Sequence, residues 1–174
     1  MNHYRDKAFE IASKNGFHDE ECSVNHFKCL IISELMEAVE ADRKGLYSDM
    51  ESFEKYETRR ITFEENFERH IKDTIEDELS DACIRIFDLA GYKDIDLEFE
   101  CAKTAEFNPE GMFTDKIYDT VHVFVGCEPL NRCLALTLKR IFAMAKEMDI
   151  DIERHIELKM QYNQTRARLH GKKY

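Results

Sequence analysis

The stretch Ser33-Glu34-Leu35-Met36-Glu37-Ala38-Val39-Glu40 indicates an amphipathic helix with an acidic residue on its apolar face. At about 100° per residue, Glu34 falls inside an apolar stripe, and Glu37 lies one turn further along at its edge. Because burial of an unpaired carboxylate is costly, we expect Glu34 to have a cationic partner. The apolar members of this stripe are Phe27, Leu30, Ala38 and Ala41.

A second acidic motif, Glu78-Leu79-Ser80-Asp81, repeats this spacing. Glu78 and Asp81 share a helix face and border an apolar stripe. If each helix brings its two carboxylates to one seam, the pattern predicts a cage of four carboxylates, formed by Glu34, Glu37, Glu78 and Asp81. Ligands that are all oxygen atoms suit Mg²⁺ or Mn²⁺. With 36 acidic residues in the chain, such pairs also arise by chance on solvated faces, where Asp81 would pair with Arg85.

Helix signals recur along the rest of the 174 residues. The run Val121–Val125 suits either a strand or a helix, and the polar segment 47–70 suits either a solvated helix or a mobile insertion. The whole predicts one all-α domain over residues 1–174, a bundle of about five to eight helices with a four-helix core. Helices are expected at 3–14, from a cap at Ser23 or Asn25 to Lys44, from Thr74 to about Ala90, at 130–148 and at 152–165.

Composition narrows the classes of partner. The chain has 36 acidic against 25 basic residues and a net charge of -11, which argues against binding to nucleic-acid polymers or anionic membranes. No run approaches the roughly 18 apolar residues that a membrane span requires. The six cysteines form no CxxC pair, so we expect reduced thiols in a cytoplasmic protein.

A local basic cluster stands out in this acidic chain. Lys159, Asn163 and Arg166 lie at i, i+4 and i+7 on one helical face, and no acidic residue follows Glu157. Lysine and arginine bind phosphate oxygens, arginine in bidentate fashion. The cluster therefore predicts a phosphate-binding or nucleotide-binding face, although a merely solubilising basic segment has the same composition.

Taken together, these motifs resemble MazG-like, all-α nucleoside triphosphate pyrophosphohydrolases, a superfamily that includes dimeric dUTPases. The resemblance rests on Glu34-x-x-Glu37, on the sequence 77–86 around Glu78-x-x-Asp81, and on the stretch from Lys159 through Asn163 and Arg166 to the sequence 170–174. The chain differs from the family at Ser33, where the usual EExxE motif has its first Glu. Residues 92–130 match no motif of the family.

The resemblance implies cleavage of a ribo- or deoxyribonucleoside triphosphate between its α and β phosphates, which gives the monophosphate and pyrophosphate. Mg²⁺, or Mn²⁺ in its place, would bind the four carboxylates, and Glu34 or Glu37 would activate the attacking water. Lys159 and Arg166 would hold phosphates, and Asn163 the sugar or a phosphate. Family bundles complete their site with a second subunit, which implies a homodimer or a dimer of dimers.

Three other interpretations stay open. The difference at Ser33 fits a catalytically weak or inactive nucleotide-binding, regulatory protein. A di-iron enzyme needs Glu-x-x-His pairs, and the nearest approach here is Asp119-x-x-His122. His18-Asp19 resembles the dipeptide of HD phosphohydrolases, but its partner motifs are not evident.

Overall fold

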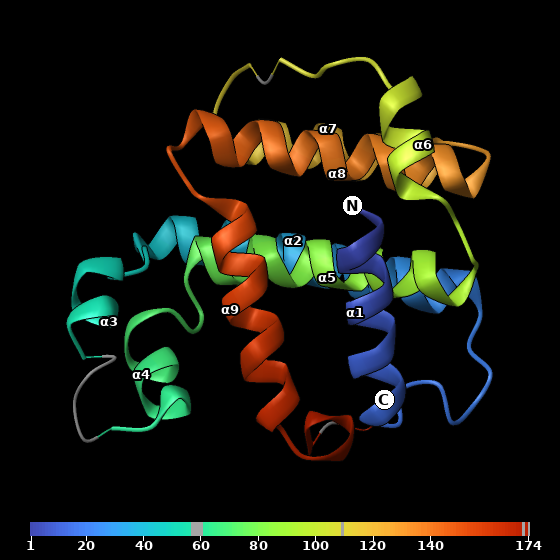
Figure 1. Ribbon diagram of the computed structural model, residues 1–174. Helices are drawn as coiled ribbons and strands as arrows, with labels where there is room; N and C mark the ends of the chain where they lie inside the picture. The colour runs from blue at the N-terminus through green and yellow to red at the C-terminus, as the bar shows by residue number, and fades with distance from the viewer. Residues whose placement is uncertain (57–60, 109, 172, 174) are drawn as a thin grey trace.

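The computed structural model describes residues 1–56, 61–108, 110–171 and 173, and all regular structure in this part of the chain is helical (Figure 1). The prediction of an all-α bundle is confirmed, and Val121–Val125 lies within a helix. No helix among the described residues has both the length and the apolar character needed to cross a bilayer. The helices are α1 (Asn2–Lys14), α2 (Val24–Lys44), α3 (Met50–Tyr56), α4 (Phe63–His70), α5 (Ile75–Tyr92), α6 (Leu97–Lys103), α7 (Phe113–Gly126), α8 (Leu130–Glu147), α9 (Ile152–Thr165) and the short 3-10 helix η1 (Arg168–Gly171).

Local sequence signals set the ends of the helices that carry the acidic motifs. The Ser23 side chain accepts a hydrogen bond from the His26 amide and caps α2, while Gly45 ends the helix with a φ of 67°. That left-handed conformation favours glycine because a Cβ atom would crowd the backbone. Thr74 caps α5 and Asp151 caps α9 in the same way as Ser23. These boundaries agree with those predicted from the sequence.

Helix α5 lies at the centre of the bundle and contacts α1, α2, α8 and α9. In Figure 1, α1 and α9 cross α5 on one side, α2 runs along it, and α7 and α8 form a further layer. Ile31 and Leu35 of α2 and Leu79 and Ile86 of α5 are fully buried between these layers. Each such side chain contributes about 1.5–3 kcal/mol through burial. The acidic motifs of α2 and α5 are therefore anchored to the most tightly held part of the fold.

The polar segment 47–70 is neither fully solvated nor detached from the bundle, although residues 57–60 lie outside the described part of the chain. Its helices α3 and α4 pack against α9 around a small second core. Phe53 and Phe67 are fully buried there, and the ring of Phe67 stacks on Tyr162 with 4.5 Å between centroids. Because the two phenylalanines have many charged neighbours in the sequence, the average composition of the segment is polar and does not indicate this core.

Candidate metal centre

Three carboxylates from two helices converge at the seam between α2 and α5. An oxygen of Glu34 from α2 and oxygens of Glu78 and Asp81 from α5 all lie within 4.8 Å of one another. Glu34 and Glu78 are buried, with 3% and 5% of their surface exposed. Spacing of three residues along α5 brings Glu78 and Asp81 to the same face, as the sequence predicts. We refer to these three residues as the acid cluster.

Glu37 does not belong to the acid cluster. Its side chain is exposed and accepts a hydrogen bond of 3.1 Å from the Ser33 hydroxyl on its own helix. Although the two residues are one turn apart, Glu34 is buried in the seam whereas Glu37 lies at the exposed edge of the apolar stripe of α2. The predicted cage of four carboxylates is therefore a cluster of three in this structure.

The buried Glu34 has the cationic partner that its position demands. Arg85 of α5 donates from Nε to Glu34 Oε1 across the helix seam. The alternative pairing of Arg85 with Asp81 does not occur as an ion pair in the described structure, since Asp81 pairs with Lys159 of α9. An ion pair between two helices also fixes how they pack, because both charges are largely removed from water.

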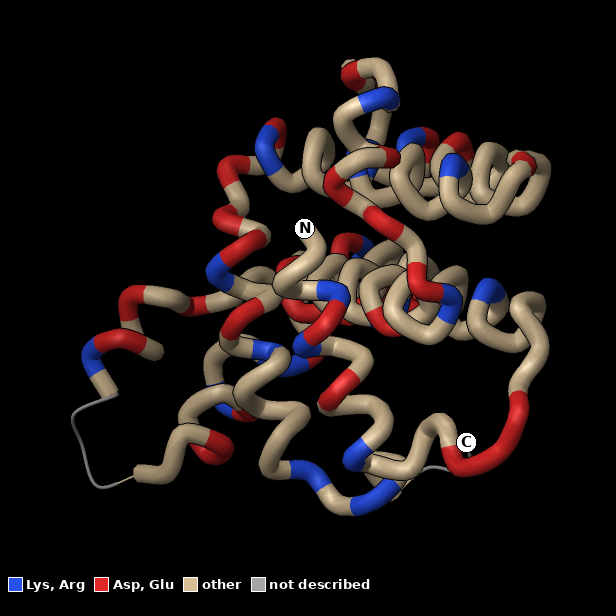
Figure 2. The backbone as a smooth tube through the Cα atoms, turned by 45° about the vertical axis from the view of Figure 1, so that its right-hand side comes forward, with Lys and Arg blue, Asp and Glu red and all other residues tan. Residues whose placement is uncertain are grey.

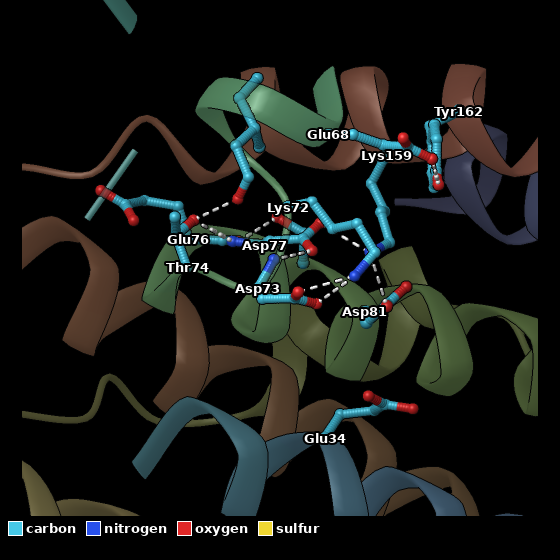
Figure 3. Close-up of polar contacts among 12 residues, drawn as sticks. Glu34, Glu68, Lys72, Asp73, Thr74, Glu76, Asp77, Asp81, Lys159 and Tyr162 are labelled. Atoms are coloured by element: carbon cyan, nitrogen blue, oxygen red, sulfur yellow. Dashed lines mark hydrogen bonds and ion pairs between the residues drawn. The ribbon is translucent and has the colours of Figure 1, made fainter. Parts of the chain in front are cut away.

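Lys159 occupies a different place from the one that the family resemblance implies. Its ammonium lies 2.7 Å from Asp77 Oδ1 and 2.8 Å from Asp81 Oδ2, and only 4% of the residue is exposed (Figure 3). These two carboxylates raise the pKa of Lys159 despite its burial, so it stays charged. The lysine therefore compensates the acidic face of α5 in this structure, and its predicted contact with phosphate stays a prediction.

The acidic groups at this seam outnumber their cations. Arg85 and Lys159 are the cations that form ion pairs with this group in the described part of the chain, and neither pairs with Glu78. Burial, then the negative charges of Asp77 and Asp81, raise the pKa of Glu78 to about 8. A divalent cation at the acid cluster would offset this repulsion, and carboxylate oxygens are the donors that Mg²⁺ and Mn²⁺ prefer.

A second acidic group overlaps the first at the start of α5. Oxygens of Asp73, Asp77 and Glu78 also lie within 4.8 Å of one another. Asp73 is exposed, however, and its carboxylate pairs with Lys72 at 2.6 Å. Because solvent screens the charge of the exposed Asp73, whereas no member of the acid cluster is exposed, the acid cluster is the stronger candidate for a metal.

A pocket of about 350 Å³ adjoins the acid cluster. Its walls come from the end of α1, the first half of α2, the middle of α5 and the segment after α9. Asp81 and Arg85 line it on the side of the cluster, and Asn163 and Arg166 line it from α9 and beyond. The volume is within the range of small-molecule sites. Of the predicted phosphate-binding residues, the structure thus brings Asn163 and Arg166 to the pocket.

Sequence reasoning missed Asp88 of this pocket, and the ion-pair partner of Arg168. Asp88 lines it and lies 2.7 Å from the imidazole of His18, while Arg168 pairs with Asp19 at 2.5 Å. Burial raises the pKa of Asp88. His18 and Asp19 therefore have different partners and do not act as a pair. The signal for Asp88 was its spacing of seven from Asp81, which places both on one face of α5.

No protein-family model, curated protein or solved structure matches this chain. The functional argument is accordingly built on the acid cluster, the pocket and their charges.

Proposed function

We propose that this protein is a metal-dependent nucleoside triphosphate pyrophosphohydrolase, which converts ribo- or deoxyribonucleoside triphosphates to monophosphates and pyrophosphate. The observation that carries the proposal is the buried carboxylate of Glu78, which forms no ion pair with a cation in the described part of the chain. Its neighbour in the acid cluster, Asp81, lines a pocket that Arg166 and Arg168 also line. Such a site suits a ligand that brings both metal and negative charge.

The donors of the acid cluster fit Mg²⁺ or Mn²⁺. Glu34, Glu78 and Asp81 offer oxygen ligands from two rigid helices, and Arg85 and Lys159 leave part of their negative charge without compensation. When bound, the cation would neutralise phosphate oxygens and make a water molecule more acidic. Burial and the negative charge of Asp81 raise the pKa of Glu34, which makes its carboxylate a better proton acceptor.

The pocket residues in and after α9 support binding of the phosphates. Arg166 lines it and has no carboxylate partner among the described residues, so its guanidinium is available to phosphate oxygens. Asn163 lies one turn earlier and offers an amide to the sugar or a phosphate. Lys159 contributes indirectly, because its ion pairs hold Asp77 and Asp81 in place.

An apolar wall completes the pocket beside these charges. Phe17, Phe27 and Leu30 line it, together with Ile84 of α5. Aromatic rings stack on nucleobases of any identity, since every base has a π-face. The wall therefore supports a nucleoside as the organic part of the ligand without selecting one base.

The alternative function is a catalytically weak or inactive nucleotide-binding, regulatory protein. The ion pair between Arg85 and Glu34 favours it, because it engages one of the three carboxylates that a metal would use. Ser33, in place of an acidic residue, removes a further charge from the same helix. Binding of nucleotide without turnover would identify this alternative.

Assembly with a second subunit is part of the proposal. Exposed apolar side chains on α2 and α7 provide surface for it, with Met36 44%, Tyr118 70% and Val125 61% exposed. A homodimer or a dimer of dimers is expected, and sedimentation equilibrium measures this directly. A single species of 20.6 kDa at micromolar concentration would contradict it.

The proposed activity is tested by incubating the protein with a panel of nucleoside triphosphates and Mg²⁺ and quantifying the products by ³¹P NMR. We expect monophosphate and pyrophosphate in equal amounts. Glu78→Gln should lower the rate by about 10² to 10⁴, as expected for loss of a metal ligand, whereas Glu40→Gln, on the exposed side of α2, should leave it unchanged. Release of orthophosphate, or no product from any triphosphate, would contradict the proposal.

A further inference from the structure

The segment after α9 folds back onto the loop that follows α1. The Leu169 amide donates to the Asn15 carbonyl at 2.8 Å, and the Arg168 guanidinium pairs with Asp19 at 2.5 Å. Figure 1 shows this segment beneath the end of α1. We call residues 166–171 the strap, because these contacts hold them across one side of the pocket.

The strap packs closely against Gly16, and two of its residues have a strained backbone conformation. Gly16 has a φ of 83°, and a Cβ atom there would lie 2.8 Å from Arg168 Nε and 3.0 Å from Asp19 Oδ2. Leu169 and His170 have φ values of 50° and 51°, a left-handed conformation that non-glycine residues rarely adopt. The contacts of the strap must offset this strain.

The strap also supplies positive charge to the pocket. Arg166, Arg168 and the following Lys173 all line it, as does Asp81 of the acid cluster. Figure 2 shows basic and acidic positions of the backbone close to the C-terminus. The side chains of Arg168 and Asp19 are 66% and 55% exposed, so solvent weakens their ion pair and an anion in the pocket can compete for the guanidinium.

We propose that Arg168 is a phosphate-binding residue that Asp19 holds in place until a ligand enters. In the bound state the guanidinium exchanges the Asp19 carboxylate for phosphate oxygens, and the ligand then holds the strap in place across the pocket. The ligand class is a nucleoside triphosphate with its metal, and this identity rests on the proposed function. The strap itself rests on the contacts of Arg168, Leu169 and Gly16.

Substitution of either partner of this ion pair should affect ligand affinity in a different way. Arg168→Gln removes a cation that would contact phosphate, and affinity should fall about tenfold. Asp19→Asn removes the competitor and a negative charge from the pocket wall, so affinity should stay the same or increase. If the ion pair only held the strap in place, both substitutions would weaken binding alike.

Isothermal titration calorimetry of the full chain with Mg²⁺ and the α,β-methylene analogues of the common nucleoside triphosphates measures these affinities without turnover. Inorganic tripolyphosphate shows how much the phosphates alone contribute. Lys14→Gln is the matched control, since it removes a cation from the same end of α1 outside the pocket lining. Binding by Arg168→Gln equal to that of the wild type would overturn the inference, as would equal weakening in Arg168→Gln and Asp19→Asn.

A second readout separates this inference from the proposed activity. Trypsin cleaves after Arg166 and Arg168, so a ligand that holds the strap in place should slow cleavage there at least several-fold in the wild type. Analogue binding and protection without pyrophosphate release would support the strap and contradict the hydrolase. Pyrophosphate release with unchanged cleavage and unchanged affinity in Arg168→Gln would contradict the strap alone.

Discussion

Arg85 of α5 donates a hydrogen bond from Nε to the carboxylate of Glu34 of α2. Only 3% of the Glu34 surface is exposed to solvent. The pair joins the two helices that carry the acid cluster. The Coulomb attraction of Arg85 opposes the effect of burial and of Asp81, both of which raise the pKa of Glu34. Arg85 thus holds a candidate metal ligand in place and limits how far its charge is suppressed.

Removal of this arginine should destabilise the protein strongly. Arg85→Met leaves Glu34 buried without its partner, and the free energy of unfolding should fall by about 3–5 kcal/mol. Urea denaturation at pH 7 measures the change. Adding Glu34→Gln to Arg85→Met should recover at least half of the loss, because the uncompensated charge is gone. A loss below about 1 kcal/mol in the single variant would show that the pair does not hold the helix seam.

Lys159→Met tests whether this lysine is structural or contacts phosphate. The substitution leaves Asp77 and Asp81 without their shared cation, so stability should fall by about 3–5 kcal/mol even without ligand. Asp77→Asn in the same chain should restore part of it. A phosphate-binding lysine would instead leave the urea midpoint of the free protein unchanged and weaken only nucleotide binding.

The sequence was sufficient to predict the main helices and the need of Glu34 for a cationic partner. Capping residues such as Ser23 and Thr74 act locally, and the apolar stripe around Glu34 already demanded a cation. The positions of Lys159 and Glu37 depend on how α9 and α2 rotate against α5, which helical spacing alone does not specify. Spacing places residues on one face, but the packing of three helices decides which partner that face meets.

The segment 47–70 shows a further limit of composition. Its two buried phenylalanines, Phe53 and Phe67, are separated by charged residues and give a weak apolar pattern. Their contact with α9 is long-range and appears only once Tyr162 is placed beside them. From the sequence alone, a small satellite core of this kind is therefore interpreted as a solvated insertion.

This second core makes a separate prediction. Phe67→Ala removes a fully buried ring that stacks on Tyr162 and should cost about 3–5 kcal/mol of local stability. Hydrogen exchange should show faster exchange of the amides in α3 and α4, while those of α5 keep their protection. Phe99→Ala, at a ring that is 58% exposed, is the control. Unchanged exchange in α4 would contradict the packing described for Phe67.

The pKa of Glu78 predicts a dependence of stability on pH in metal-free protein. Its pKa rises from 4.5 in the unfolded chain to about 8 in the folded protein, so the folded state binds the proton more tightly. This contribution to stability is fully present below pH 4.5 and is lost as the pH rises through 8. Glu78→Gln lacks it, since glutamine does not titrate.

Calorimetric unfolding in EDTA from pH 5 to 8.5 measures the difference. The melting temperature of Glu78→Gln should rise relative to the wild type as the pH increases, and saturating Mg²⁺ should remove or reverse that advantage. Asp77, whose pKa is raised to about 6, is present in both proteins and contributes to both curves. Parallel curves for the two proteins would show that Glu78 is not held in an acidic, buried setting.

Binding of Mn²⁺ at pH 7, followed by isothermal titration calorimetry in two buffers of different ionisation enthalpy, tests the acid cluster most directly. Because Glu78, with a pKa of about 8, is mostly protonated at this pH, the metal should displace about one proton. Glu78→Gln should bind at least tenfold more weakly without proton release, and Glu40→Gln should match the wild type. Absence of binding, or binding that Glu78→Gln leaves unchanged, would contradict a metal centre at Glu34, Glu78 and Asp81.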